Sequence, residues 1–373
     1  MIYLDYAADT PVCNEVLEVF AEASKTYFAN PNANHMLGKR AKACLEETTN
    51  EIATMFKVKP QEIIYTSGAT ESNNLAIKGI AEHYGRKGKH LITTYLEHSS
   101  VTGPMSYLQE KGYEIDFVDI LPNGEVDVQH LQELLRPDTI LVSIAYVDSE
   151  LGIQQNIDQI GKLIESYSNC FFHVDATQAV GKVDIDTTYI DLMTFTAHKV
   201  YGIHGIGALI KKEKIFLTPS IHGGLSTTPF RSGTPSLALI ISMKKALELA
   251  FTNEKMNYEH VYALNKLLRE KLAHYPNVQV NSSEKAVPYI LNVSLKGIKA
   301  SDFHAKLEEK GIYISTKSAC TTPNTPSRPV MALTKDRKRA LSTLRISLSH
   351  LTTHEEIKTF LEVFDTCYQE LSK

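Results

Sequence analysis

The sequence has few cysteines, and they are not spaced for a metal site or a disulfide framework. The five are Cys13, Cys44, Cys170, Cys320 and Cys367. No CxxC pair occurs, so we expect no metal ion. An odd and sparse set also argues against structural disulfides and fits a reducing compartment, so we expect a cytoplasmic protein.

Long apolar runs and an excess of one charge sign are absent too. No apolar run approaches about 18 residues, so no membrane span is expected. The first residues, MIYLDYAADTPV, lack the basic and apolar regions of a signal peptide. The 39 basic and 43 acidic residues are interspersed and leave a net charge of -4, so nucleic acid is not expected as a direct partner. The composition, 43% hydrophobic over 373 residues, is that of a globular protein, and the length predicts two domains.

The middle of the chain alternates short β-branched runs with amphipathic stretches. Strands are predicted at Glu62–Thr66, His90–Thr94, Glu114–Val118, Ile140–Ala145, Cys170–Val174, Leu192–Phe195 and Gly207–Ile210. Helices such as Ser72–Tyr84 and Ile157–Ser166 are predicted between them. This alternation predicts an α/β fold with a mainly parallel, seven-stranded sheet covered by helices. Ligands of such sheets bind beyond the carboxyl ends of the strands.

The pattern changes after Pro235. Apolar residues at helical spacing predict a helix from Leu237 to about Tyr275. A smaller α/β unit follows, and its last helix is predicted to start near Thr353, where Thr353 and Glu356 can form a capping box. The segment Thr321–Pro329 has three prolines and no periodicity, so we expect an irregular or mobile loop there.

Two motifs place ligand-binding groups at strand ends. Thr66–Asn74, TSGATESNN, follows a strand and opens a helix, whose free N–H groups suit a phosphate; a plain turn with a helix cap is the alternative. Phe172–Gln178, FHVDATQ, ends an apolar strand in Asp175. That carboxylate is costly to bury unless it is paired, for example with a protonated pyridine nitrogen, whereas a helix cap is again the alternative.

A third motif carries a lysine. Asp191–Leu209 runs from a strand through Thr196, His198 and Lys199 into glycines and a second strand. A partly desolvated amine has a lowered pKa, which favours Schiff-base chemistry. The alternative is a surface lysine beside a histidine whose hydrogen bonds are already made within the protein.

Three further side chains stand in places that suggest chemistry. His98, in LEHSSV just beyond a strand, can stack on a planar ring or transfer protons, although a lone loop histidine is often merely satisfied. Cys320 begins the proline-bearing loop with Lys317 nearby, and a neighbouring cation favours a reactive thiolate over a buried inert thiol. Arg345 lies inside an apolar strand, which is expensive unless it meets a carboxylate.

Taken together, these motifs resemble the fold-type I pyridoxal-phosphate enzymes. Within them, the stretch Asp191–Leu209 is similar to the lysine signature of class V aminotransferases, and the whole chain is similar to the NifS/IscS-type cysteine desulfurases. The resemblance runs through IYLDYAADTPV, NPNANHMLGKRA, SGATESNN, EHSSV, VDATQAVGK, TAHKVYGIHGIGAL, RSGTPS, STKSAC and RISLSHLTT.

The resemblance implies a role for each matching residue. Lys199 would hold pyridoxal 5'-phosphate as a Schiff base and take the Cα proton, and Cys320 would accept the substrate sulfur. For the cofactor, the implied contacts are Asp175 at the pyridine nitrogen, Gln178 at the phenolic oxygen, His98 on the ring, Ser149 at the position of a usual asparagine, and Ala69, Thr70, Thr196 and His198 at the phosphate. Thr234 would reach it from a neighbouring subunit, which implies a homodimer. Arg345, with Asn34 or alternatively Asn30, would receive the carboxylate of L-cysteine.

The implied organisation is a large cofactor-binding domain, residues 15–256, and a small domain, residues 1–14 with 257–373, carrying the Cys320 loop at about 315–333. Its length resembles the subgroup that hands persulfide directly to a sulfur-acceptor protein, in iron–sulfur assembly, tRNA thiolation or thiamine synthesis. The expected reaction converts L-cysteine to L-alanine with a persulfide on Cys320. One departure is Val147–Gly152, VDSELG, where Ser149 replaces the family's asparagine. The alternatives are an aminotransferase, a selenocysteine lyase, or a protein that keeps this fold but mainly binds partners.

Overall fold

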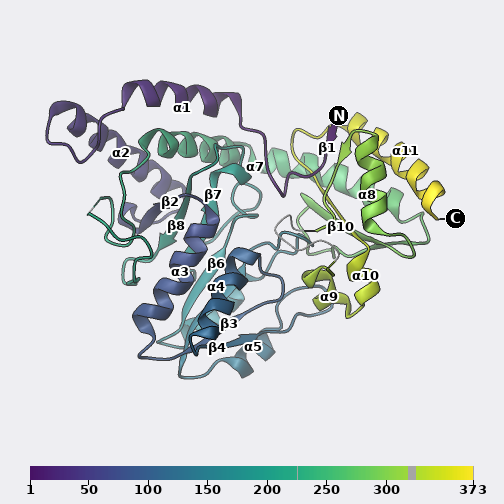
Figure 1. Ribbon diagram of the computed structural model, residues 1–373, viewed down its shortest axis with the longest axis horizontal. Helices are drawn as coiled ribbons and strands as arrows, with labels where there is room; N and C mark the ends of the chain where they lie inside the picture. The colour runs from purple at the N-terminus through teal and green to yellow at the C-terminus, as the bar shows by residue number, and fades with distance from the viewer. Residues whose placement is uncertain (225, 318–324, 373) are drawn as a thin grey trace.

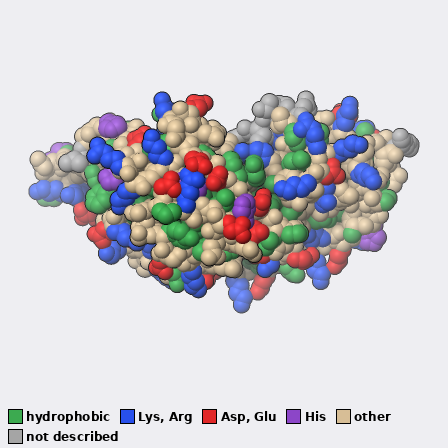
Figure 2. Space-filling model, turned by 90° about the horizontal axis from the view of Figure 1, so that it is seen from below, with side chains coloured by type: hydrophobic (Ala, Val, Ile, Leu, Met, Phe, Trp, Pro, Cys, Tyr) green, Lys and Arg blue, Asp and Glu red, His purple; other side chains and the backbone are tan. Residues whose placement is uncertain are grey.

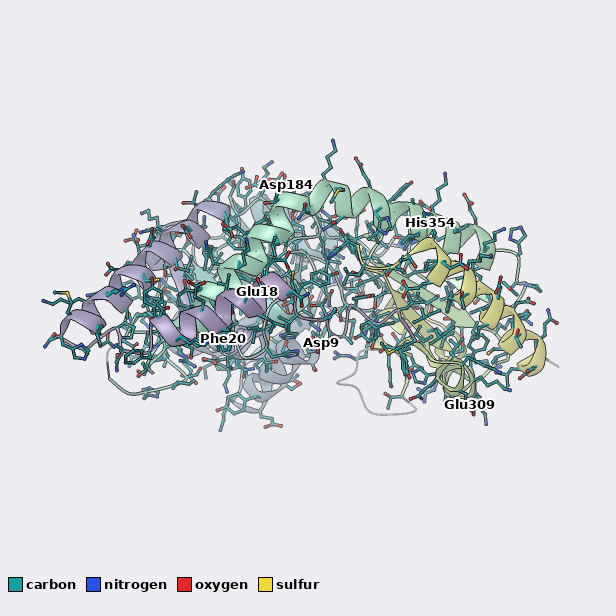
Figure 3. The ribbon with its side chains drawn as sticks, turned by 90° about the horizontal axis from the view of Figure 1, so that it is seen from above. Asp9, Glu18, Phe20, Asp184, Glu309 and His354 are labelled. Carbon is teal, nitrogen blue, oxygen red and sulfur yellow. The ribbon has the colours of Figure 1, made fainter. Side chains whose placement is uncertain are left out.

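A computed structural model describes residues 1–224, 226–317 and 325–372 of the chain. Figure 1 shows two α/β units side by side, the larger built on a central sheet and the smaller formed mainly by the C-terminal part. The long helix α7, Leu237–Leu272, belongs to both, as Figure 3 shows from above.

The larger unit is built on a seven-stranded sheet in the order β2-β8-β7-β6-β5-β3-β4. Its strands are β2 Ile63–Thr66, β3 His90–Thr93, β4 Glu114–Phe117, β5 Thr139–Ala145, β6 Phe171–Asp175, β7 Leu192–Thr196 and β8 Gly207–Lys211. Only β8 runs antiparallel to its neighbours, β2 and β7. The mainly parallel sheet predicted from the sequence is confirmed, and each strand lies within one residue of its predicted limits.

Both faces of the sheet are buried, which explains why its strands read as continuous apolar runs. Neighbouring strand residues point to opposite faces: Leu141 joins the core under α3 and α4, whereas Val142 joins the core under α6 and α7. The helices of this unit are α1 Asn14–Thr26, α2 Met36–Met55, α3 Ala69–Tyr84, α4 Ser99–Glu110, α5 Val128–Leu134 and α6 Ile157–Glu165, with 3₁₀ turns at Pro60–Glu62 and Ala197–Lys199.

The smaller unit contains an antiparallel sheet and ties both ends of the chain together. Its elements are β9 Val278–Val280, β10 Ile290–Leu295, β12 Thr343–Ser347, α8 Ala300–Glu309, α10 Arg337–Leu341 and α11 His354–Leu371. Strand β1, Ile2–Tyr3, pairs with β11, Ile312–Tyr313, so the N-terminal segment lies against this unit. The predicted capping box is confirmed, since Thr353 and Glu356 bond each other's backbone N–H at the start of α11.

The prediction that Thr321–Pro329 is irregular is wrong at the end of that segment. Helix α9, Arg328–Thr334, begins inside it, because the Ser327 hydroxyl accepts from the N–H of Val330 and Pro329 stands in the first turn, where no N–H is needed. Residues 318–324, including Cys320, lie outside the described residues.

Two surface properties bear on possible partners. Figure 2 shows basic and acidic side chains interspersed over the face in view, without a continuous patch of one sign. No helix in the described ranges is long and apolar enough to cross a membrane.

Candidate active site

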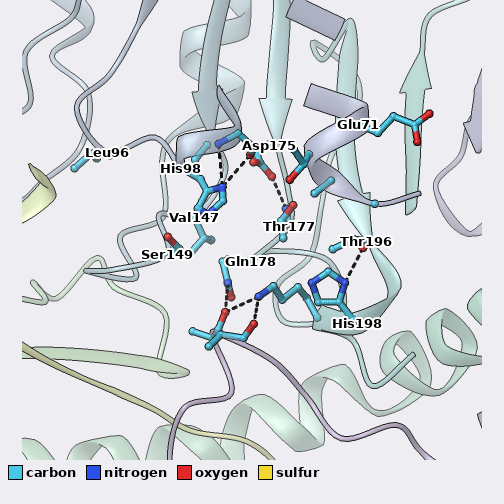
Figure 4. Close-up of a pocket in the computed structure, with 18 of the residues that line it drawn as sticks. Glu71, Leu96, His98, Val147, Ser149, Asp175, Thr177, Gln178, Thr196 and His198 are labelled. Atoms are coloured by element: carbon cyan, nitrogen blue, oxygen red, sulfur yellow. Dashed lines mark hydrogen bonds between the residues drawn. The ribbon is translucent and has the colours of Figure 1, made fainter. Parts of the chain in front are cut away.

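A cavity of about 360 Å³ opens beyond the carboxyl ends of β5, β6 and β7 (Figure 4). Parallel strands direct their last residues to one edge of the sheet, so motifs far apart in the sequence meet there. Ten of the residues singled out in the sequence line it: Ala69, Thr70, His98, Ser149, Asp175, Gln178, Thr196, His198, Lys199 and Arg345.

One wall of the cavity is the start of α3. The N–H groups in the first turn of a helix have no partner within the helix and carry its positive dipole end. Residues Ser67 to Thr70 line the cavity at this point. Gly207 of β8 makes room for the turn, because a Cβ there would lie 2.7 Å from the Phe195 carbonyl oxygen and 2.8 Å from Gly68 Cα. The arrangement suits a bound phosphate.

Thr196 and His198 lie opposite this turn, at the end of β7. His198 Nδ1 and Thr196 Oγ1 are 3.1 Å apart, and the His198 ring stacks on His204 with centroids 4.8 Å apart. Burial, followed by the positive charge of Lys199, lowers the pKa of His198 to about 4. His198 is therefore a neutral hydrogen-bonding group at neutral pH.

Asp175 ends β6 on the floor of the cavity and is 6% exposed. Its Oδ1 accepts from the Thr177 N–H at 3.0 Å, and its Oδ2 accepts from Asn73 Nδ2 at 2.8 Å. Each carboxylate oxygen keeps a lone pair for a further donor. A protonated ring nitrogen is a donor of the right kind.

His98 caps α4 beside Asp175. The Ser100 N–H donates to His98 Nδ1 at 3.2 Å, so the neutral ring carries its proton on Nε2. Asn73 Nδ2 donates to Ser100 Oγ at 2.8 Å, and that hydroxyl lies 2.9 Å from His98 Nδ1. Burial lowers the pKa of His98. The ring is thus oriented by hydrogen bonds and is uncharged.

Lys199 follows β7 and reaches the N-terminal segment. Its Nζ donates to the carbonyl oxygen of Ala7 at 2.9 Å and also to that of Ala8. Gln178 Nε2 donates to the same Ala7 oxygen at 2.9 Å. The backbone at Ala7 and Ala8 therefore closes one side of the cavity and holds the amine there.

Arg345 supplies a buried positive charge at the cavity's far side and is 2% exposed. Its Nη2 donates to Asp5 Oδ1 at 2.9 Å, and its Nη1 donates to the Ser149 carbonyl oxygen at 2.8 Å. The expectation that Arg345 meets a carboxylate is confirmed. Its Nε is buried without a hydrogen-bond partner in the described structure, so the guanidinium keeps donor capacity.

The cavity leaves three candidates unplaced: two lie outside its lining, and one falls outside the described residues. Asn34 and Thr234 are exposed and do not line it within one chain. Cys320 lies outside the described residues. Their roles stay predictions.

Sequence reasoning missed two residues that organise the site. Asn73 links Asp175 to the Ser100–His98 pair, and Asp5 pairs with Arg345. Both stand inside quoted motifs, TSGATESNN and IYLDYAADTPV, but nothing in a linear pattern shows which of two neighbouring polar residues turns inward.

The geometry agrees with comparisons to known proteins. The aminotransferase class-V family model matches residues 2–360. The chain is 38% identical over 379 residues to a "NifS/IcsS protein homolog" of Lactobacillus delbrueckii subsp. bulgaricus, covering 100% of this chain and 98% of that protein. It is 39% identical over 365 residues to the "Cysteine desulfurase IscS" of Buchnera aphidicola subsp. Baizongia pistaciae, covering 95% and 90%. A solved "NIFS-LIKE PROTEIN" superposes with a TM-score of 0.93 at 30% identity, covering 99% of this chain and all of the other.

The chain therefore belongs to the aminotransferase class-V family, and pyridoxal phosphate is its cofactor. The residues present fit this group. The free N–H groups at the start of α3 suit its phosphate, the buried Asp175 suits its ring nitrogen, and Lys199 provides the amine.

Proposed function

We propose that this chain is a cysteine desulfurase, which converts L-cysteine to L-alanine and passes the sulfur to an acceptor. The observation that carries the proposal is the cavity itself, in which Lys199, Asp175 and Arg345 converge with the N-terminus of α3. The relatives called cysteine desulfurase match over nearly the whole chain, which supports this reaction.

The cofactor's place follows from the groups around the cavity. Ala69, Thr70, Thr196 and His198 would hold its phosphate, and Lys199 would hold it covalently. Asp175 would accept from the ring nitrogen, Gln178 would donate to the ring oxygen, and His98 would cover the ring. When bound, pyridoxal phosphate supplies an electron sink for the charge that develops at the substrate Cα.

The protein's own groups handle the substrate and the proton. Arg345 is the cation available for the substrate carboxylate, and Asn34 is the proposed second contact. The Lys199 amine would take the proton from the substrate Cα and return one to the product. Ser149 is shorter than the family's asparagine, so its contact with the ligand would run through a water.

The sulfur step belongs to Cys320. Its thiolate would attack the substrate sulfur, the Cβ–S bond would break, and Cys320 would become a persulfide while alanine leaves. A thiol on a loop can approach the substrate and then face an acceptor protein. We propose direct delivery to such a protein, in the cytoplasm, by a homodimer in which each subunit lends Thr234 to the other's phosphate site.

The test is product analysis with L-cysteine. We expect alanine and protein-bound persulfide in equal amounts, and no amino transfer to a keto acid. Transfer to a keto acid without persulfide would favour an aminotransferase, and faster turnover of selenocysteine than of cysteine would favour a selenocysteine lyase.

A further inference from the structure

A second buried lysine stands directly behind the cavity wall. Lys182 follows β6 on the same segment as Gln178 and is 8% exposed. Its Nζ donates to Gln178 Oε1 at 2.8 Å. The functional roles proposed above do not use this side chain.

The contact decides which way the Gln178 amide faces. Lys182 Nζ donates to the amide oxygen, and in its ammonium form it accepts no hydrogen bond, so protonated Lys182 keeps that oxygen turned toward itself. The nitrogen then faces the opposite way, and its bond to the Ala7 carbonyl oxygen at 2.9 Å agrees with that orientation. In Figure 4 a dashed line joins Gln178 to this segment, and Lys199 Nζ donates to the same Ala7 oxygen at 2.9 Å. One N–H of Gln178 holds Ala7, and the other is available to the cavity.

Lys182 occupies this place at a cost in free energy. Burial, followed by the positive charges of Lys199 and Arg345, lowers its pKa to about 7. A methionine of similar length would fill the space without desolvating an amine. The side chain is therefore not needed for packing.

We propose that Lys182 is a positioning residue for the cofactor, which locks the Gln178 amide with an N–H directed into the cavity. That N–H would donate to the oxygen on the cofactor ring, so this inference rests on the proposed function. Without Lys182, the Gln178 amide can turn and present its oxygen to the oxygen on the cofactor ring, and the hydrogen bond between them is lost.

The test is a double-mutant cycle with Lys182→Met and Gln178→Ala. Apoprotein is titrated with pyridoxal phosphate, and both the dissociation constant and the absorption maximum of the bound cofactor are measured. Each single variant should bind about three- to tenfold more weakly and shift the maximum, as expected for one lost hydrogen bond. Because Lys182 acts through Gln178, the double variant should bind no more weakly than Gln178→Ala alone.

Lys211→Met is the matched control. Lys211 is also buried, at 2% exposure, but its Nζ donates to backbone carbonyl oxygens such as that of Ile215, away from the cavity. This variant should leave the absorption maximum unchanged. Lys182→Gln retains an N–H donor on a side chain that is one bond shorter. Its affinity for the cofactor should lie between those of the wild type and Lys182→Met.

Three results would overturn the inference: wild-type affinity and spectrum for Lys182→Met, additive losses in the double variant, or Lys182→Gln binding no better than Lys182→Met. Failure of the proposed function would look different, since the wild-type protein itself would then form no alanine from L-cysteine.

Discussion

Replacing Asp175 with asparagine should separate the charge of this side chain from its shape. The two residues have nearly the same size, but the asparagine amide has one acceptor oxygen and no charge. Asp175 now accepts one hydrogen bond on each oxygen, from Thr177 N–H and from Asn73 Nδ2. In Asp175→Asn, one of these buried donors faces an NH₂ group.

The structure sets the size of both effects. A buried donor without a partner costs about 1–3 kcal/mol, so the free energy of unfolding should fall by that amount. The effect on turnover is larger, because the charge that would keep the ring nitrogen protonated is lost. Removing one preorganised electrostatic contact lowers kcat by about 10²–10³.

The assay combines urea unfolding, the cofactor's absorption spectrum and the rate of alanine formation from L-cysteine. Asp191→Asn is the matched control. Asp191 stands at the opposite end of β7 and its Oδ2 accepts from the Phe172 N–H at 3.1 Å. It should lose stability without a change in spectrum or kcat. If Asp175→Asn kept wild-type turnover, the assignment of Asp175 to the ring nitrogen would be refuted.

Three further changes test the burial of Glu97, the packing of Gly207 against the turn at Gly68, and the Cys320 thiol. Glu97 is fully buried, and burial raises its pKa from 4.5 to about 8. Between these values the unfolded chain has released a proton that the folded chain keeps, so the free energy of unfolding falls as pH rises from 4.5 to 8. In unfolding experiments across this range, Glu97→Gln should remove up to about 5 kcal/mol of that loss. If the variant's free energy of unfolding depended on pH as the wild type's does, the burial argument would be contradicted. Gly207→Ala should weaken cofactor binding by about tenfold or more, because its Cβ would displace the turn at Gly68. Gly103→Ala in α4 should be tolerated, because nothing lies within 4 Å of its Cβ. Equal cofactor affinities for the two variants would count against a phosphate site at the start of α3. Cys320→Ala should bind the cofactor normally yet form no persulfide, and full sulfide release would rule out its role.

The strands could be predicted because they are short β-branched runs between turn signals, and burial on both faces leaves them apolar. Nine of the ten residues around the cavity could be found because they end or follow a strand or open a helix, and the fold brings those ends together. Arg345 could be found because it is a charged residue inside an apolar strand.

Other features depend on contacts that have no sequence period. The Asp5–Arg345 pair joins residues 340 apart, and the start of α9 depends on the Ser327 hydroxyl within a proline-rich segment. The hydrogen bond from Lys182 to Gln178 joins residues four positions apart, but nothing in VDATQAVGK shows that the amine is buried.

The most direct test of the account concerns Lys199. Wild-type protein and Lys199→Ala are each incubated with pyridoxal phosphate, and the absorbance of covalently held cofactor is recorded before and after adding L-cysteine, with alanine quantified. We expect a protein-bound chromophore that responds to cysteine, together with alanine, in the wild type alone. The same chromophore and the same alanine yield from Lys199→Ala would contradict this expectation.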